Sequence, residues 1–263
     1  MMKTDTLDQI AYELYKAERY VSEVTKFVDQ YPELTVETAY DIQAKLIELK
    51  RMHEQTTVSG LKLGLTSKAK QQMMGVHEPS YGMLLANMEL NPQLPISLKS
   101  LIHPKIEPEI AFVFKEDLHG PIVTVAQVLK ATDYITPAME IIDSRYLNFN
   151  FTLPDVIADN SSSSRYIVSS QKYAVNEVDL VNMGCIFTHN DEIFATSTAG
   201  SVMGHPARAI VWMANKLIAR GQHIRAGDVV LSGALTGAAT MHAGDCFTVS
   251  FDGMESLTVE VDQ

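Results

Sequence analysis

The stretch His103-Pro104-Lys105-Ile106-Glu107-Pro108-Glu109 runs directly into the apolar segment Ile110-Ala111-Phe112-Val113-Phe114. The apolar segment is rich in β-branched and aromatic residues and predicts a buried strand. Side chains alternate between the faces of a strand, so Glu107 and Glu109 are expected to point the same way. Such a pair fits either a strand end with two solvated glutamates or a site for a divalent cation, since Mg²⁺ and Mn²⁺ prefer oxygen ligands. Pro108, which lacks a backbone N–H, predicts a sheet edge or a bulge here.

A third carboxylate occurs in a second apolar stretch, Ile135-Thr136-Pro137-Ala138-Met139-Glu140-Ile141-Ile142-Asp143-Ser144-Arg145. A single buried glutamate is usually paired with a basic residue, and Arg145 is a candidate partner for Glu140. Three such glutamates on two strands are harder to explain by pairing alone. A further strand is predicted over residues 58–65 and carries Lys62, whose ammonium either faces water or points into a pocket.

The composition is that of an ordinary soluble globule, with 46% hydrophobic and 20% charged residues in 263. The net charge of −11 and the absence of a basic run argue against nucleic acid as a partner. No apolar stretch is long enough to cross a bilayer, and the N-terminus lacks the apolar core of a signal peptide, so no membrane partner is expected. Cys185 and Cys246 fit buried free thiols, and we predict a cytoplasmic protein.

The periodicity changes along the chain from helical to strand-like. Residues 5–50 follow helical spacing, with a break at Tyr31-Pro32-Glu33 and Thr35 as the N-cap of a second helix. Short strands follow, with a hairpin over residues 183–196 and a helix from Pro206. We therefore predict an α+β fold in which a helical segment, residues 1–55, packs on a β-rich catalytic domain, residues 56–263.

Two loops of small or polar residues carry possible ligand contacts. The loop Asp159-Asn160-Ser161-Ser162-Ser163-Ser164-Arg165 fits either a solvated linker or the lining of an anion pocket. The loop Gly233-Ala234-Leu235-Thr236-Gly237-Ala238-Ala239-Thr240 would allow backbone amides to lie beside a ligand.

In combination, several segments resemble the family of 2-hydroxypentadienoate hydratases and 4-oxalocrotonate decarboxylases, within the fumarylacetoacetate hydrolase superfamily. The resemblance extends from the second N-terminal helix to Val261. The segments that carry it are Lys62-Leu63-Gly64-Leu65-Thr66-Ser67, Glu107-Pro108-Glu109-Ile110-Ala111, Met139-Glu140-Ile141-Ile142-Asp143-Ser144-Arg145, Ala158-Asp159-Asn160 and Gly204-His205-Pro206.

The resemblance implies a β-sandwich-like roll of the fumarylacetoacetate hydrolase type with Mg²⁺, or alternatively Mn²⁺, in its pocket. It also implies a homo-oligomer and association with a partner 2-hydroxypentadienoate hydratase. It assigns the metal to Glu107, Glu109 and Glu140, a catalytic role to Lys62, and substrate contacts to Leu65, Thr66, Ser162 and Thr236.

Within the family, the chain looks more like the decarboxylase branch. Hydratases typically carry Glu-Pro-Asp-Tyr-Gly, whereas this chain has Glu78-Pro79-Ser80-Tyr81-Gly82, without the carboxylate that would handle water. His103 and the run Asp143-Ser144-Arg145-Tyr146-Leu147-Asn148-Phe149 also resemble the decarboxylases. Arg145 and Arg165 need not bind the departing carboxylate, because holding it tightly would stabilise the ground state.

The implied activity is metal-dependent decarboxylation of a 2-oxo dicarboxylate, 2-oxohex-3-enedioate, in meta-cleavage breakdown of aromatic compounds. The products are 2-hydroxypenta-2,4-dienoate and CO₂, with the metal stabilising a dienolate. The alternatives are hydration of 2-hydroxypenta-2,4-dienoate to 4-hydroxy-2-oxopentanoate and a non-catalytic assembly subunit that keeps the fold.

Overall fold

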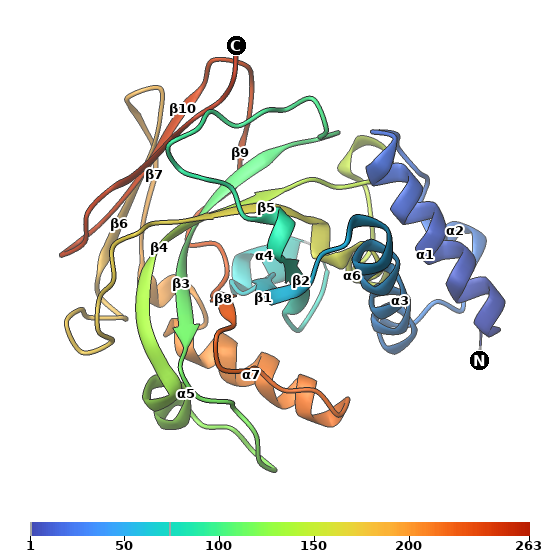
Figure 1. Ribbon diagram of the computed structural model, residues 1–263, viewed down its shortest axis with the longest axis horizontal. Coiled ribbons are helices and arrows are strands. Elements are labelled where there is room, and N and C mark those ends of the chain that lie inside the picture. Colours follow the sequence, from blue (N-terminus) through green and yellow to red (C-terminus); the bar gives the residue numbers. More distant parts are fainter. Residues whose placement is uncertain (1, 74) are drawn as a thin grey trace.

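A strongly curled seven-stranded sheet forms the middle of the protein in the computed structural model, which describes residues 2–73 and 75–263. The N-terminal helices lie at one end of this sheet and a four-stranded sheet lies at the other (Figure 1). The strands of the large sheet are β1 (Val58–Gly64), β2 (Ser80–Leu85), β3 (Lys105–Phe114), β4 (Thr132–Ile142), β5 (Ser163–Val168), β8 (Val229–Leu231) and β9 (Ala239–Thr240). Those of the small sheet are β6 (Gly184–His189), β7 (Glu192–Thr198), β10 (Cys246–Phe251) and β11 (Leu257–Glu260).

The helices occupy the N-terminal end and the outside of the large sheet. They are α1 (Thr4–Arg19), α2 (Phe27–Gln30), α3 (Val36–Glu54), α4 (Lys68–Met73), α5 (Val125–Ala131), α6 (Leu153–Ala158) and α7 (Pro206–Ala219), with short 3₁₀ turns η1 (Ala86–Met88), η2 (Leu147–Phe149), η3 (Asn160–Ser162) and η4 (Ala199–Ser201). None of the described helices is both long and apolar enough to cross a membrane.

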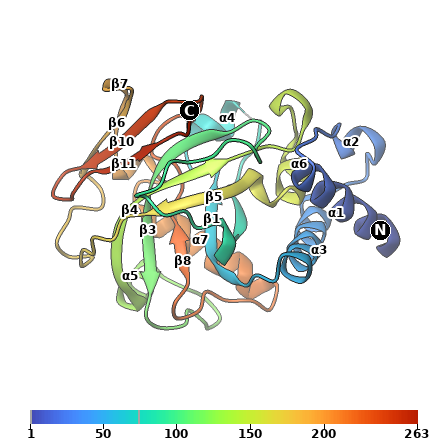
Figure 2. The ribbon, with the colours of Figure 1, turned by 45° about the horizontal axis from the view of Figure 1, so that its top comes forward.

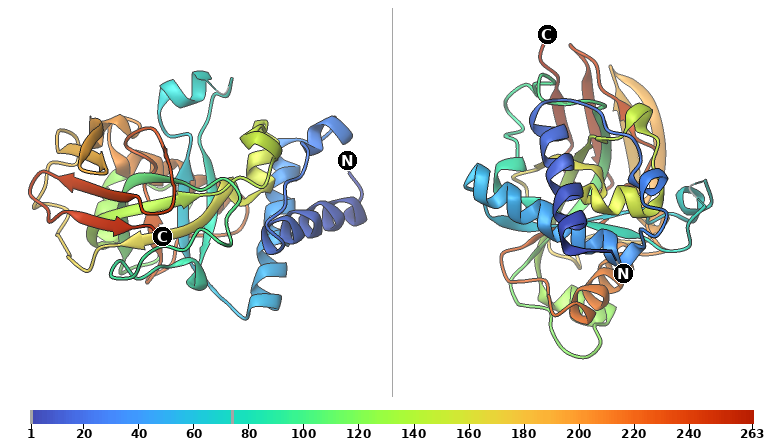
Figure 3. Two further views of the ribbon diagram at one scale, coloured as in Figure 1. Left: turned by 90° about the horizontal axis from the view of Figure 1, so that it is seen from above. Right: turned by 90° about the vertical axis from the view of Figure 1, so that its right-hand side faces the viewer.

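The predicted N-terminal helices are present and pack as a layer on the end of the roll. Buried residues such as Ile10 and Leu14 line the side of α1 that contacts α3, and α3 in turn contacts α6 and β2 (Figures 2 and 3). Thr35 caps α3 as predicted, because its hydroxyl oxygen accepts the Thr38 N–H at 3.2 Å. The division of the chain at residue 55 into a segment and a domain stays a prediction.

Strand β3 lies inside the large sheet, in the order β2-β1-β8-β3-β4-β5, so the expectation of an edge strand at Pro108 is wrong. No bulge occurs at Pro108 either, since it pairs in register with Met139 of β4. The proline is tolerated because β8 and β9 leave a gap along this part of β3. The Pro108 carbonyl faces that gap and accepts the Leu235 N–H at 3.0 Å. The nitrogen of Pro108 faces the same gap, where no neighbouring strand would accept a hydrogen bond from it.

The large sheet curls until its two edges meet. The chain just after β2 bridges to β5, where the Leu90 N–H donates to the Tyr166 carbonyl at 2.9 Å. The Tyr166 hydroxyl also lies 3.1 Å from Ser59 Oγ on β1. The inner face of the sheet is therefore enclosed, and polar side chains that point inward are removed from solvent.

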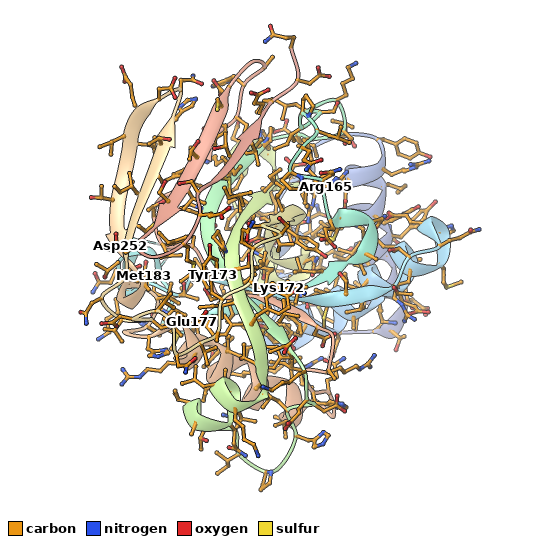
Figure 4. All side chains as sticks on the ribbon, turned by 60° about the vertical axis from the view of Figure 1, so that its left-hand side comes forward. Arg165, Lys172, Tyr173, Glu177, Met183 and Asp252 are labelled. Carbon is orange, nitrogen blue, oxygen red and sulfur yellow. The ribbon has the colours of Figure 1, made fainter. Side chains whose placement is uncertain are left out.

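The small sheet packs over one side of the roll through β10, which contacts β4. The chain reaches it along residues 169–183, in which Tyr173 bridges Ile135 of β4. At the start of β6 the Gly184 N–H donates to Asp252 at 2.9 Å. Figure 4 labels Tyr173 and Asp252. The hairpin of β6 and β7 matches the predicted one, with left-handed residues Asn190 and Asp191 at its turn. The predicted α+β, sandwich-like roll is confirmed.

Candidate functional site

The three predicted glutamates meet on the inner face of the roll. Glu107 on β3 lies directly opposite Glu140 on β4, and Glu109 is two residues further along the same face of β3. One carboxylate oxygen of each lies within 4.8 Å of the others. The side chains are buried, with Glu107 8% exposed and both Glu109 and Glu140 fully enclosed. The hypothesis of a solvated strand end is therefore wrong.

Burial makes these carboxylates hard to ionise without a cation. Loss of water raises the pKa of Glu109 well above its ordinary value, and repulsion from Glu140 and Glu107 raises it further. Burial also raises the pKa of Glu140, although the nearby Lys62 ammonium opposes the shift. The Gly233 N–H donates to Glu109 Oε2 at 2.6 Å and supports the ionised form of that carboxylate.

The donor atoms fit a hard divalent cation. Oε1 of Glu109 and Oε1 of Glu140 are buried and have no hydrogen-bond partner within the described part of the chain. A buried oxygen without a partner is costly, so these atoms point to a ligand that accepts their lone pairs. Three carboxylates without a sulfur or imidazole ligand match the preference of Mg²⁺ and Mn²⁺ for oxygen.

Lys62 reaches this centre from β1. Strands β8 and β3 separate β1 from β4, which in a flat sheet places their backbones roughly 14 Å apart. The Lys62 ammonium nevertheless lies 3.1 Å from Glu140 Oε2, because the sheet is curled and both side chains are long. Lys62 is only 2% exposed. The ammonium therefore points into the enclosed site rather than into water.

Arg145 is not the partner of Glu140, contrary to that expectation. Its guanidinium donates to the Asp159 carboxylate and, at 2.6 Å each, to the carbonyl oxygens of Asp143 and Asp159. Arg145 and Asp159 are both buried. Because its donors are occupied, Arg145 supports the loop beside the site and does not offer a charge to a substrate.

The loop from Asp159 to Ser164 is buried, so its interpretation as a solvated linker is wrong. Its residues Asn160, Ser161 and Ser162 have φ values of 49°, 52° and 55°, a left-handed conformation that costs about 1–2 kcal/mol per residue. The Asn160 side chain holds the loop by accepting the Met83 N–H at 2.7 Å and donating to the Met83 carbonyl at 2.9 Å. Ser162 Oγ is left buried without a hydrogen-bond partner among the described atoms, which suits its predicted contact with substrate.

A pair of hydroxyls lies beside Lys62. A Cβ placed on Gly64 would lie 2.8 Å from Ser80 Oγ and 3.8 Å from Lys62 Nζ, so both atoms meet at this glycine. Ser161 Oγ is 3.2 Å from Ser80 Oγ. The position at which hydratases are expected to carry aspartate thus faces the site. Ser161 did not stand out in the sequence, because only the contact between η3 and β2 reveals its place.

The other predicted substrate contacts, Leu65, Thr66 and Thr236, differ in how close the structure places them to the glutamates. Thr66 is buried against Gly233, whose φ of 103° and proximity to the threonine leave no room for a side chain. Leu65 forms the turn before Thr66, with a φ of 56°. Thr236 follows the segment anchored to Pro108, but its hydroxyl already donates to the Gly237 carbonyl at 2.9 Å. Thr66 is therefore next to Glu109 through Gly233, whereas the side chain of Thr236 has a local partner.

The titration of the carboxylates predicts how metal binding depends on pH. The pKa values of Glu109 and Glu140 are raised in the folded state. Between the ordinary glutamate pKa and these raised values, the folded chain holds protons that the unfolded chain has lost, so the stability of the metal-free protein falls as pH rises through that range. Mg²⁺ needs the ionised carboxylates. The rise in melting temperature caused by Mg²⁺ is thus expected to be larger near pH ~8 than near pH ~6. Calorimetry at both pH values checks this, and equal rises would contradict it.

Comparisons with known proteins find relatives along nearly the whole chain. Residues 58–262 match the family described as fumarylacetoacetate (FAA) hydrolase C-terminal. The chain is 41% identical to a 4-oxalocrotonate decarboxylase of Pseudomonas sp. (strain CF600) over 98% of both chains, and 36% identical to a 2-hydroxyhexa-2,4-dienoate hydratase of Comamonas testosteroni over 94% of both. It superposes on 4-oxalocrotonate decarboxylase from Pseudomonas putida G7, solved in complex with magnesium and adipate, with a TM-score of 0.93, 36% identity and 99% coverage of both chains.

Proposed function

Since this chain belongs to the fumarylacetoacetate hydrolase family, and within it to the group of hydratases and decarboxylases, we propose that it is a magnesium-dependent carboxy-lyase. The substrate is 2-oxohex-3-enedioate and the products are 2-hydroxypenta-2,4-dienoate and CO₂. The observation that carries the proposal is the buried centre of Glu107, Glu109 and Glu140, in which Oε1 of Glu109 and of Glu140 lack a hydrogen-bond partner among the described residues, with Lys62 beside it. The relative solved with magnesium and adipate, a six-carbon dicarboxylate, supports both the metal and the substrate class.

The reaction breaks the bond between C5 and the distal carboxylate. The electron pair of that bond moves through the double bond to the 2-oxo oxygen, CO₂ leaves, and one proton is taken up to give the dienol. Glu107, Glu109 and Glu140 would hold the magnesium ion, which when bound supplies Lewis-acid stabilisation of the charge that develops on the 2-oxo oxygen. The enclosed face of the roll strengthens these charge interactions by excluding water.

Lys62 is the residue of this chain that we assign to the developing charge. Its ammonium is anchored by Glu140 at 3.1 Å, so it holds a proton at the edge of the carboxylate centre. We propose that it donates a hydrogen bond to the 2-oxo oxygen as charge builds there. The hydroxyls of Ser162 and Thr66 and the backbone at Leu65 would then contact the rest of the substrate. The loop that carries Thr236 would close this side of the pocket.

Ser80 favours decarboxylation over hydration. A hydratase must place a water molecule for addition across a double bond and move its proton, for which a carboxylate is a suitable base. Ser80 lies beside Lys62 but carries a neutral hydroxyl, which is a far weaker base than a carboxylate at neutral pH. The distal end needs no cation to hold it. Arg145 is occupied by Asp159, and Arg165 donates to Ser164 and Ser100.

The test offers each of two substrates to the purified protein. With 2-oxohex-3-enedioate we expect CO₂ release that requires Mg²⁺ and stops when EDTA is added. With 2-hydroxypenta-2,4-dienoate we expect no 4-hydroxy-2-oxopentanoate and no loss of diene absorbance faster than without enzyme, whereas a hydratase would speed that loss without releasing CO₂. Absence of metal-dependent CO₂ release would contradict the proposal. Failure of the wild type to bind Mg²⁺ in a calorimetric titration would favour the non-catalytic assembly subunit.

The assembly and cellular context follow from the same proposal. The dienol product reverts easily to a keto form, so a partner hydratase that consumes it directly would prevent its loss. We therefore infer a homo-oligomer that associates with such a hydratase, in the cytoplasm, during meta-cleavage breakdown of aromatic compounds. Light scattering after size-exclusion chromatography, with and without the hydratase, measures both associations.

A further inference from the structure

Two loops at the end of β3 remote from the glutamates are joined by a single antiparallel bridge. Leu118, in the connection from β3 to α5, pairs with Ile224, in the connection from α7 to β8, and donates its N–H to the Ile224 carbonyl at 2.9 Å. Both of these side chains are buried in the core. Because side chains alternate along extended backbone, the neighbours Asp117, His119 and His223 project outward on the same side.

These three outward side chains form a compact cluster of metal-ligating groups. One ligand atom from each of Asp117, His119 and His223 lies within 4.8 Å of the others. Asp117 Oδ2 is 3.5 Å from His223 Nε2, and the rings of His119 and His223 meet edge to face with centroids 5.2 Å apart. The Ala226 N–H donates to Asp117 Oδ1 at 2.8 Å, which fixes the carboxylate and turns Oδ2 toward His223, where an ion could bind both groups.

We propose that Asp117, His119 and His223 form a second metal site, for a transition-metal ion of the Zn²⁺ class. Imidazole nitrogens with one carboxylate suit Zn²⁺, Ni²⁺ or Cu²⁺ rather than Mg²⁺. Ligand atoms at ~2.0–2.2 Å from a tetrahedral zinc ion lie roughly 3.4 Å from one another, which the observed spacing reaches after small side-chain rotations. Three protein ligands on an exposed surface leave the fourth position to water.

A plain ion pair does not explain the whole cluster. Asp117 and His223 alone would satisfy each other, with the carboxylate near the ring nitrogen. His119 adds a second imidazole to this pair: its ring meets the His223 ring edge to face and it also acts electrostatically on Asp117, so the three side chains form one group that a single ion could bind. The buried Leu118–Ile224 bridge fixes both backbones. The three ligands are therefore held together before an ion binds, and binding requires little further loss of conformational entropy.

The second site is separate from the glutamate centre. The end of β3, Phe114, lies five residues beyond Glu109, roughly 17 Å along an extended strand, and Asp117 follows in the connection from β3 to α5. Figure 1 shows the course of this connection. A metal at this surface would tie the loop after β3 to the loop before β8. We therefore expect it to stabilise the fold and to leave the chemistry of the glutamate centre unchanged.

Copper spectroscopy distinguishes the two sites, because the glutamate centre offers only oxygen ligands. The full-length protein is freed of metal with EDTA, saturated with Mg²⁺ and given one equivalent of Cu²⁺. Electron paramagnetic resonance is expected to show nitrogen superhyperfine splitting. In a parallel calorimetric titration, Zn²⁺ should bind with one site per chain beyond the Mg²⁺ site.

The variants His223→Gln and His119→Asn test the assignment, and His77→Gln removes an exposed histidine elsewhere as the matched control. Each of the first two is expected to weaken Zn²⁺ binding more than ~100-fold, because even an outer-shell partner of a metal typically contributes about 10–100-fold. Zn²⁺ should raise the melting temperature of the wild type and the control but not of these two variants, whose metal-free melting temperatures stay at the wild-type value. Absence of Zn²⁺ binding to the wild type, or equal binding by His223→Gln, would overturn the proposal.

Discussion

Replacing Glu109 by glutamine is expected to abolish magnesium-dependent CO₂ release from 2-oxohex-3-enedioate while the fold persists. The amide keeps the shape of the side chain and its oxygen still accepts the Gly233 N–H. It removes one of three negative ligands, however, and with it the cation that stabilises the developing charge. A loss of about 4 kcal/mol of that stabilisation corresponds to a rate about 10³-fold lower. Steady-state assays over a range of Mg²⁺ concentrations measure the effect.

Two controls separate loss of the metal from loss of the fold. The metal-free variant should melt no lower than the metal-free wild type, because glutamine does not carry the desolvation cost that raises the pKa of Glu109. Glu192→Gln, an exposed change on β7, should leave turnover and Mg²⁺ affinity as they are. Wild-type turnover by the Glu109→Gln enzyme would count against the glutamate centre as the site of chemistry.

Replacing Arg145 by methionine is expected to lower the free energy of unfolding by about 3–5 kcal/mol, the usual cost of removing one partner of a buried ion pair. The change leaves the Asp159 carboxylate buried without its cation and removes the donors to the Asp143 and Asp159 carbonyls. The strained turn at Asn160 directly follows Asp159 and would lose its support. Urea denaturation monitored by circular dichroism measures the change.

Arg165→Met is the matched control, since Arg165 is only partly buried and its hydrogen bonds within the described residues go to Ser164 and Ser100. The Arg165→Met change should lower the free energy of unfolding by less than ~1 kcal/mol. The double change Arg145→Met with Asp159→Asn should recover part of the stability lost in Arg145→Met alone, because it removes the orphaned charge. Equal destabilisation by Arg145→Met and Arg165→Met would show that the buried pair has no special role.

The sequence predicted those features that depend on neighbouring residues. Alternation along one strand placed Glu107 and Glu109 on the same face, but the spacing left open whether that face was solvated or enclosed. Thr35 marked the start of α3 because an N-cap is a local hydrogen bond. The hairpin turn at Asn190 followed from the same kind of local preference.

Resemblance to a family supplied what periodicity could not. Lys62 and Glu140 lie far from Glu107 in the chain, and nothing in the spacing alone required them to share a site. The segments that matched the family named the three glutamates and the lysine together, and the register of β3 with β4 and the curl toward β1 show why they meet. Their roles in metal binding and catalysis await the assays proposed above.

The tertiary structure decided which distant groups are partners. The local sequence favoured Arg145 as the partner of Glu140, only five residues away, yet the curl of the sheet brings Lys62 to Glu140 and leaves Arg145 to Asp159. The serine loop was ambiguous because small polar residues suit both water and a buried turn. It is buried because its turn η3 packs against β2 and α3, which are distant from it in the chain, and against α6, which is only adjacent to it in the chain until the fold forms.

Strand order and loop pairing also decided the surroundings of Pro108 and of the cluster of Asp117, His119 and His223. Pro108 predicted an edge strand, but β3 lies inside the sheet. Its neighbours β8 and β9 leave a gap beside Pro108, the residue of β3 that lacks a backbone N–H. Asp117 and His223 are separated by more than a hundred residues and meet only through the bridge between Leu118 and Ile224. The sequence alone thus determined the strands, the caps and the shared face of Glu107 and Glu109, which local steric and hydrogen-bonding preferences encode. The pairing of distant charges depends on strand order and curvature, and these arise only when the whole core is buried together.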